Sequence, residues 1–245
     1  MPDGGTKDPA APPGVLGFGC YRPLRRAHAR SALHATIRRV TLTVLEHPLA
    51  EDIVTRLRDR RTGPAEFRTL ARRLGTLLVA EATRGLPTEP VVVDTPLEEA
   101  KGRALVGCLV AIPVLRAGLG LLDSVTDLYP WAVVGYLGME RDEVTLEPRD
   151  YYAKLPPMGG CTAVVLDPML ATGGSGSAAC RYVKAAGPDG VVFVCVVAAP
   201  EGVAKMEADH PDVPIVAAAL DRGLNDQGFI MPGLGDFGDR LHGTT

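Results

Sequence analysis

The sequence predicts an α/β fold whose mostly parallel sheet is covered by helices on both faces. Two observations lead to this class. Short apolar runs alternate with segments of helical periodicity, and these runs are continuously apolar. A strand of that kind is buried on both faces, as in a parallel sheet between two helix layers. With 245 residues, 46% of them hydrophobic, the chain is long enough for one sizeable core.

The periodic part of the sequence begins at residue 49 with two predicted helices. Ile53 and Leu57 lie on one apolar stripe, a second stripe spans residues 67–78, and Gly63-Pro64 separates the two helices. We expect this pair to form an N-terminal cover. The predicted strands follow as VVVD (91–94), ALVGCLVAIPVL (104–115), AVVGYLGM (132–139), AVVLD (163–167), VVFVCVVAAP (191–200) and VPIVAAAL (213–220). In such sheets ligands bind at the carboxyl ends of the strands.

Residues 1–39 differ in composition from the rest and predict a disordered or poorly ordered extension to a domain spanning 40–245. The first 20 residues are dense in Gly, Pro and Ala, and residues 21–39 are rich in Arg, Ala and His without an acidic side chain. A solvated tail, a start assigned too far upstream, a transit-like segment and a nucleic-acid-touching arm all remain open.

Charge and cysteine content exclude several classes of protein. The net charge of −3 divides into +5 over residues 1–39 and −8 over the remainder, which argues against a general nucleic-acid binder. Five cysteines contain no CxxC pair and no histidine at metal-ligand spacing, so neither a disulfide framework nor a zinc site is indicated and a reducing cytoplasm is favoured. No apolar run approaches the roughly 18 to 20 residues of a membrane span.

The strongest candidate site is DPMLATGGS at 167–175, which leaves the strand AVVLD and enters a helical run at 177–186. A turn of Gly and hydroxyl residues before a helix points several backbone N–H groups at one place, and that place suits a phosphate dianion. Gly173 and Gly174 allow close backbone approach, while Thr172 and Ser175 add hydroxyl donors. Asp167, an acceptor when ionised, suits ribose hydroxyls.

The segment 167–179 has three other possible interpretations: a nucleoside-triphosphate P-loop, a dinucleotide-binding turn and a turn without a ligand. A nucleoside-triphosphate P-loop would need GxxxxGK[ST], which is absent. Gly174, Gly176 and Ala179 match the GxGxxA pattern of dinucleotide folds, with Glu201 after the next strand, but these glycines come seven residues too late after the strand. A glycine-rich turn without a ligand is the third reading.

DPMLATGGS resembles the signature by which uracil phosphoribosyltransferases bind 5-phosphoribosyl 1-pyrophosphate (PRPP). The resemblance runs from about Val44 to the C-terminus. Its other landmarks are VLEHPL (44–49), FRTLARRLGTLLVAEAT (67–83), IPVLRAGLG (112–120), GMERDEVTLEP (138–148), VVAAPEG (196–202) and LNDQGFIMPGLGDFGDR (224–240). The resemblance implies the type I phosphoribosyltransferase fold, with a catalytic domain over 40–245 and a C-terminal base-binding hood. It also implies transfer of the phosphoribosyl group to N1 of uracil, giving UMP and pyrophosphate.

The resemblance further implies which residues bind PRPP and carry catalysis. Arg116, Arg141, Asp167 and Asp236 are the expected catalytic residues. The complete expected PRPP set is Arg116, Ala117, Gly118, Arg141, Asp167, Pro168, Met169, Leu170, Ala171, Thr172, Gly173, Gly174, Ser175 and Asp236. Arg141 stands between two acids, Glu140 and Asp142, where relatives commonly carry Tyr-Arg-Asn, so its hold on pyrophosphate is expected to differ. The polar, Pro-broken stretch 141–160 resembles a flexible lid.

The C-terminal segment 228–239 is too Gly-rich for a strand or helix and predicts exposed backbone. Uracil presents an acceptor, a donor and an acceptor along O2, N3–H and O4, which backbone groups can match at fixed spacing. By resemblance, Ile230, Gly235, Asp236 and Phe237 form the uracil site. Cytosine would leave buried partners unpaired.

The expected partners are therefore small molecules, uracil and PRPP, with no nucleic acid and no membrane. We expect Mg²⁺ to bind mainly through PRPP oxygens, because no carboxylate cage is evident. The family adds GTP as a candidate activator and a homodimer or homotetramer as the assembly, for which the apolar N-terminal helices are one candidate interface. Two alternatives remain open: a catalytically weak nucleotide-binding regulator of the same fold, and a paralogue acting on a modified pyrimidine.

Overall fold

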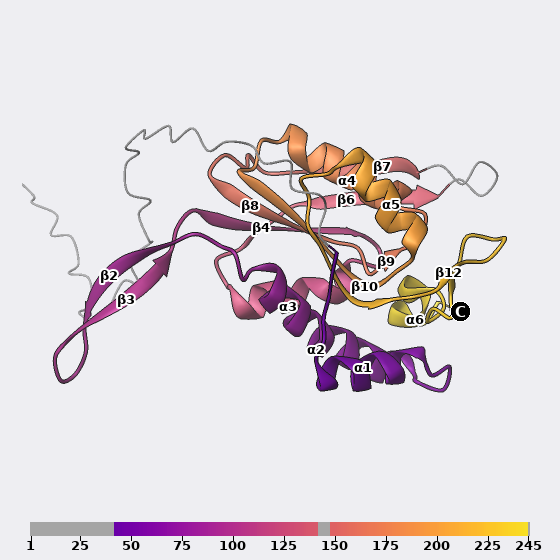
Figure 1. The fold of residues 1–245 in the computed structure, drawn as a ribbon, viewed down its shortest axis with the longest axis horizontal. Helices are drawn as coiled ribbons and strands as arrows, with labels where there is room; N and C mark the ends of the chain where they lie inside the picture. Colours follow the sequence, from indigo (N-terminus) through magenta and orange to yellow (C-terminus); the bar gives the residue numbers. More distant parts are fainter. Residues whose placement is uncertain (1–41, 142–147, 245) are drawn as a thin grey trace, which may run out of the picture. The chain divides into compact units, whose positions relative to one another are not determined.

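The computed structural model describes residues 42–141 and 148–244 (Figure 1). These residues all belong to one compact unit. The predicted extension at 1–39 lies outside the described residues, so the proposed boundary at 39/40 stays a prediction.

A large, mostly parallel sheet forms the centre of this unit and confirms the predicted fold class. Its strands run in the order β1-β11-β10-β8-β4-β6-β7, with β5 beside β4 and β9 beside β10. Only the β6–β7 pair within this described sheet is antiparallel. The strands are β1 (Leu42–Val44), β4 (Cys108–Leu115), β5 (Val133–Val134), β6 (Tyr136–Arg141), β7 (Pro148–Lys154), β8 (Cys161–Leu166), β9 (Met169–Leu170), β10 (Gly190–Ala198) and β11 (Ile215–Leu220).

Helices cover both faces of the sheet, as predicted (Figure 1). One layer holds α1 (Pro48–Arg58), α2 (Pro64–Ala82) and α3 (Leu119–Leu128), and the other holds α4 (Gly174–Ala185) and α5 (Pro200–Asp209). Adjacent residues of β8 point to opposite faces of the sheet. Val164 packs in the hydrophobic cluster that includes residues of α1 and α2, and Val165 packs in the hydrophobic cluster that includes residues of α4. This alternation explains why the strand sequences are apolar throughout.

One predicted strand belongs to a different sheet. The run VVVD lies in β2 (Thr88–Asp94), which pairs antiparallel with β3 (Glu99–Leu105) in a separate hairpin. Val92 and Val93 are 61% and 50% exposed, so the expectation of a buried parallel strand was wrong here. β-branched residues favour any extended strand, and the partner strand EAKGRAL is mostly polar, so the hairpin does not cover these valines within the chain.

Four smaller differences have local causes. The run 104–115 is divided by Gly107, whose positive φ of 84° makes a turn between β3 and β4. Part of the expected lid, Pro148–Lys154, is strand β7. The Gly-rich C-terminal segment contains the two-residue strand β13 (Ile230–Met231), paired with β12 (Gly223–Leu224), and the start of helix α6 (Phe237–His242). β1 was too short to be predicted.

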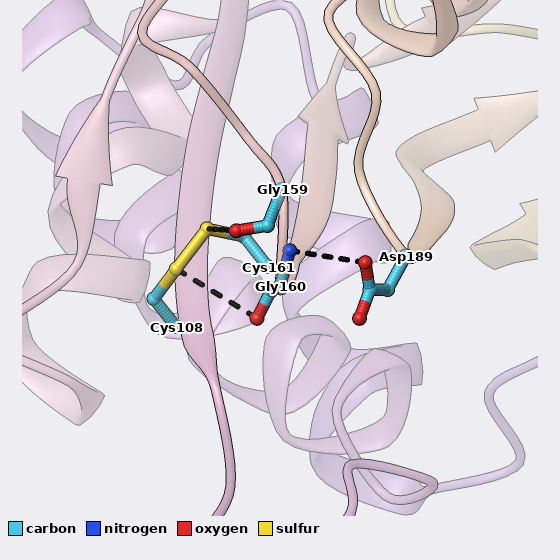
Figure 2. The surroundings of a disulfide bond; sticks show 5 residues. All are labelled: Cys108, Gly159, Gly160, Cys161 and Asp189. Atoms are coloured by element: carbon cyan, nitrogen blue, oxygen red, sulfur yellow. Dashed lines mark hydrogen bonds between the residues drawn. A yellow bond between two sulfur atoms is a disulfide. The ribbon is translucent and has the colours of Figure 1, made fainter. Parts of the chain in front are cut away.

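A disulfide joins Cys108 and Cys161, the first residues of β4 and β8 (Figure 2). The sequence indicated no disulfide, and for this pair that expectation was wrong. The parallel register pairs Cys108 directly with Cys161 at a Cα–Cα distance of 4.4 Å, and spacing along the chain cannot reveal such a register. Cys180 and Cys195 are free and buried, and burial raises the pKa of the Cys180 thiol to about 12.

Reduction of the disulfide is expected to lower the free energy of unfolding by about 4 kcal/mol, because the bond closes a loop of 53 residues in the unfolded chain. Urea unfolding followed by circular dichroism, with and without dithiothreitol, measures the loss. The Cys108→Ser variant should unfold identically in both conditions. Five free thiols in the denatured, non-reduced protein would contradict the pairing, which leaves three.

Candidate active site

The phosphate loop lies at the carboxyl end of β8, as predicted. Strand β8 ends at Leu166, the segment 167–173 follows, and α4 begins at Gly174. Gly173 is the residue before the helix and has a φ of 80°, which glycine adopts without strain. The backbone N–H groups of the first turn of α4 have no acceptor within the helix, and Gly173 offers no side-chain cap, an arrangement that suits an anion.

Glycines let the loop and helix α5 approach closely. A Cβ at Gly202 would stand 2.5 Å from the Ala171 carbonyl oxygen and 2.8 Å from that of Leu170. A Cβ at Gly173 would stand 2.9 Å from the Gly202 carbonyl oxygen. Helix α5 is thus the support against which the loop is shaped.

A partly buried polar cluster ties the first turn of α4 to the end of α5. Ser177 Oγ donates to Asp209 Oδ2 at 2.6 Å, and His210 Nε2 lies 2.8 Å from the Ser177 carbonyl oxygen. Hydrogen bonds from Ser177 and then Lys205 hold the pKa of Asp209 below its usual range. The serine bonds to both partners, so the cluster fixes the helix that starts at the loop.

Asp167 is the buried carboxyl of the site, with 9% of its surface exposed. Burial raises its pKa to about 7, while a weak hydrogen bond from the Met169 N–H acts in the opposite direction. Pro168 adds a fixed carbonyl, which accepts from the N–H groups of Val196 and Val197. A carboxylate in this position is short of hydrogen-bond donors, which sugar hydroxyls would supply.

The Arg116 segment lies beside the phosphate loop, at the end of β4. The Leu115-Arg116 peptide is cis, a feature that the sequence did not reveal. A Cβ at Gly118 would stand 2.3 Å from the Leu166 carbonyl oxygen, so only glycine lets this segment reach the end of β8. Ala117 lies next to Gly118 in this turn and faces the start of α6. A Cβ added at Gly238 would stand 3.9 Å from the Cβ of Ala117.

The C-terminal loop joins the site through α6. Arg116 Nη2 lies 3.2 Å from Asp239 Oδ1, and Asp236 caps the helix by accepting from the Asp239 N–H at 2.8 Å. Phe237 is buried, with its ring 5.0 Å from the Phe67 ring, so its side chain belongs to the core. Ile230 is also buried, and Gly235 has a φ of 82°.

The fourth predicted catalytic residue is placed only as backbone. Arg141 is the last residue of β6, pairing with Pro148. The side chains of Glu140 and Arg141, and Asp142 itself, lie outside the described residues, so the effect of the two acids on the arginine stays a prediction.

Sequence reasoning missed several charged residues that hold these loops. Arg58 pairs with Asp221, and both bond to the loop at Gly233. Arg240 donates to the Leu234 and Asp59 carbonyl oxygens, each at 2.7 Å, and its guanidinium lies 4.5 Å from the centre of the Phe67 ring. These partners are up to 181 residues apart along the chain. The only available signal was their position beside predicted strand or helix ends.

The fold and the site together define the chain as a phosphoribosyltransferase. A phosphate loop, a buried aspartate and an arginine turn meet at the carboxyl ends of adjacent parallel strands, with a Gly-rich loop beside them. The glycines of the GxGxxA match lie within the first turn of α4, not in a turn ahead of it, so the dinucleotide reading fails.

Comparison with known proteins then gives the particular family. The family model described as uracil phosphoribosyltransferase matches residues 44–244. Uracil phosphoribosyltransferases of Dictyoglomus thermophilum and Symbiobacterium thermophilum are each 49% identical, covering 82% and 83% of this chain and 98% of their own length. The AQ2163 protein from Aquifex aeolicus superimposes with a TM-score of 0.80 at 39% identity, over 84% of this chain and 99% of that chain. The chain belongs to the uracil phosphoribosyltransferase family.

Two further findings concern membrane-spanning helices and groups of side chains that could hold a metal ion. Within residues 42–141 and 148–244, no helix combines the length and the apolar character needed to cross a membrane. In the same residues, no three His, Cys, Asp or Glu side chains gather closely enough to hold a metal ion.

The raised pKa of Asp167 predicts how stability depends on pH. Between pH values of about 4 and about 7 the folded protein keeps a proton that the unfolded chain has lost, so stability falls as pH rises through this window. Asp167→Asn removes this loss. The variant should gain about 2 to 4 kcal/mol over wild type at pH 8 and little at pH 4, because each pH unit is worth about 1.4 kcal/mol. Urea unfolding at the two pH values measures this, and equal differences would contradict it.

Proposed function

We propose that the chain transfers the phosphoribosyl group of PRPP to N1 of uracil and releases pyrophosphate, as in pyrimidine salvage. The observation that carries this proposal is the meeting of the phosphate loop, Asp167 and the Arg116 turn at one edge of the sheet. The sequence match to uracil phosphoribosyltransferases over nearly the whole of their length supports the choice of base.

PRPP is proposed to lie across the ends of β8 and β4. Its 5-phosphate would bind the backbone and hydroxyl groups of Thr172, Gly173, Gly174 and Ser175, and its ribose hydroxyls would donate to Asp167. Residues 168–171 would shape the turn between these two contacts. The pyrophosphate would bind to the guanidinium of Arg116 and to the backbone of Ala117 and Gly118, because the two parallel N–H donors of an arginine match phosphate oxygens.

Arg141 and Asp236 complete the proposed PRPP site from two other segments. The first stands at the end of β6 and the second at the cap of α6. Because Arg116 contacts Asp239 in the same first turn of α6, pyrophosphate and base are expected to bind on either side of this helix start.

Uracil is proposed to be read by the backbone of the loop 230–237. Ile230, Gly235, Asp236 and Phe237 would offer main-chain groups to O2, N3–H and O4. The burial of the Phe237 ring in the core supports a role for its backbone alone. A fixed backbone wall rejects cytosine because two of its groups would face like partners.

The chain's own residues act on the reaction by position and charge. Asp167 orients the ribose, Arg116 stabilises the negative charge of the departing pyrophosphate, and the C-terminal loop aims N1 at the anomeric carbon. No described side chain stands as a general base in this proposal. Mg²⁺ is proposed to bind mainly through PRPP oxygens, where it would neutralise negative charge.

Self-association is proposed to use the β2–β3 hairpin. Val92, Val93 and Leu97 expose 50% to 95% of their surface there. The base of the hairpin borders a cavity of about 300 Å³ lined mainly by apolar side chains, including Leu86, Leu105 and Leu128. The apolar stripes of α1 and α2, the interface expected from sequence, are buried within the chain itself. An exposed apolar surface of this kind fits a second copy of the chain.

Activation by GTP and a cytoplasmic location also remain proposals. A cavity of about 500 Å³ lined by Arg68, Arg72 and Arg73 offers cationic side chains for the phosphates of a nucleotide. Arg72 is already paired with Asp127, so a nucleotide would have to compete for it. A cytoplasmic location is supported by the small phosphorylated substrate, and the Cys108–Cys161 pair would then meet reducing thiols.

The activity predicts a specific product from a panel of bases. Purified protein with PRPP and Mg²⁺ should form UMP from uracil, and at least about 100-fold less product from cytosine. Anion-exchange chromatography of the nucleotides measures both. Parallel reactions with EDTA or added GTP test the metal and the activator. Binding of PRPP without product would favour the regulator, and preferential use of another pyrimidine would favour the paralogue.

The proposed interface predicts that charge in the hairpin dissociates the assembly. Val92→Lys combined with Leu97→Lys should convert a dimer or larger species into monomer, because lysine opposes burial of an apolar surface. Analytical ultracentrifugation gives the mass. Leu49→Lys, at an exposed position of α1, is the matched control and should leave the assembly intact. If Leu49→Lys dissociates the assembly and the hairpin variant does not, the interface lies at the N-terminal helices instead.

A further inference from the structure

The loop with the proposed uracil wall is held by an ion pair whose partners come from distant parts of the chain. Arg58 is the last residue of α1, and Asp221 follows the last residue of β11. The guanidinium donates Nη1 to Oδ2 at 2.8 Å and Nη2 to Oδ1 at 2.6 Å. The side chains are only 24% and 5% exposed, so water screens this two-pronged contact weakly.

Both members of the pair also bind one residue of the loop. Arg58 Nη1 donates to the Gly233 carbonyl oxygen at 2.7 Å, and the Gly233 N–H donates to Asp221 Oδ2 at 2.9 Å. The two polar groups of a single residue are thus held by opposite charges. Neither adjoining peptide plane can rotate without breaking a charge-assisted hydrogen bond.

Gly233 is a point at which the loop has no freedom to adjust. Its φ is 63°, and a Cβ there would stand 2.2 Å from the Ile230 carbonyl oxygen. Ile230 and Gly235, two residues of the proposed wall, lie three and two positions away along the chain. A shift at Gly233 would therefore be passed to both ends of the wall.

We propose that Arg58 and Asp221 are positioning residues that set the spacing of the uracil wall and so determine base selection. This inference rests on the proposed function and extends it to residues outside the loop. Backbone recognition depends on where the amides stand, since no side chain can rotate to restore a lost hydrogen bond. Within the described residues, the side chains of the pair hydrogen-bond to each other and to Gly233, and neither hydrogen-bonds to the phosphate loop or to the Arg116 turn.

The phosphate loop offers an internal comparison, because its support is separate. Ser177 and Asp209 hold α4, and within the described residues neither side chain hydrogen-bonds to Arg58 or Asp221. Loss of the Arg58–Asp221 pair, here called the clamp, should therefore weaken uracil use far more than PRPP use, because Asp236 is the one proposed PRPP residue in the loop that the clamp holds. A general loosening of the fold would affect both substrates.

The test compares Arg58→Lys and Asp221→Asn with wild type. Lysine keeps the charge and loses the fork, while asparagine keeps the shape and loses the charge. We expect the KM for uracil to rise about tenfold in each, the KM for PRPP to stay within about twofold, and discrimination against cytosine to fall. Glu66→Gln breaks the exposed Arg56–Glu66 pair at the neighbouring helix start and should change neither KM.

Hydrogen–deuterium exchange adds a readout that does not need activity. Both clamp variants should exchange faster at residues 228–236 and unchanged at 167–175, with the Gly233 amide as the direct reporter. Equal rises in both KM values, or an unchanged KM for uracil, would overturn the inference. If wild type makes no UMP, the proposed function fails, and exchange still decides: an unaltered 228–236 segment in both variants would overturn the clamp.

Discussion

The contact between the ends of β4 and β8 is the constraint on which the rest of the site depends. The two strands run side by side, and the turn after β4 folds back until Gly118 meets the Leu166 carbonyl. Nothing larger than hydrogen fits between them. This approach places an arginine turn next to a buried aspartate, which neither strand could do alone. The remaining parts of the site are arranged around that junction.

Three supports hold the loops at this junction, and each uses different chemistry. Close glycine contacts and the Ser177–Asp209–His210 cluster hold the phosphate loop against α5. The capped start of α6 holds Arg116 through Asp239. The third is the Arg58–Asp221 pair beneath the C-terminal loop. Their independence means that a change in one substrate's site need not disturb the other.

Much of this arrangement could be predicted from sequence because its signals are local. Apolar runs, Gly63-Pro64 and DPMLATGGS each encode structure within a few residues, and they gave the layers, the cover helices and the phosphate loop. The errors concern pairing between distant segments. VVVD looks the same in a hairpin as in a buried sheet, and the Cys108–Cys161 register exists only once β4 lies beside β8. The Arg58–Asp221 pair was not predicted for the same reason: its partners meet only in the folded chain.

The proposed uracil wall, if it is built of main chain, has an evolutionary consequence. Exposed side chains of the loop, such as Phe229, could then change without altering which base is accepted, because the main-chain groups proposed to read the base are common to every residue. Heritable change in base preference would then arise at positions that never touch the base. Residues 58 and 221, on other elements and far away in the chain, are where selection for a new pyrimidine would leave its record.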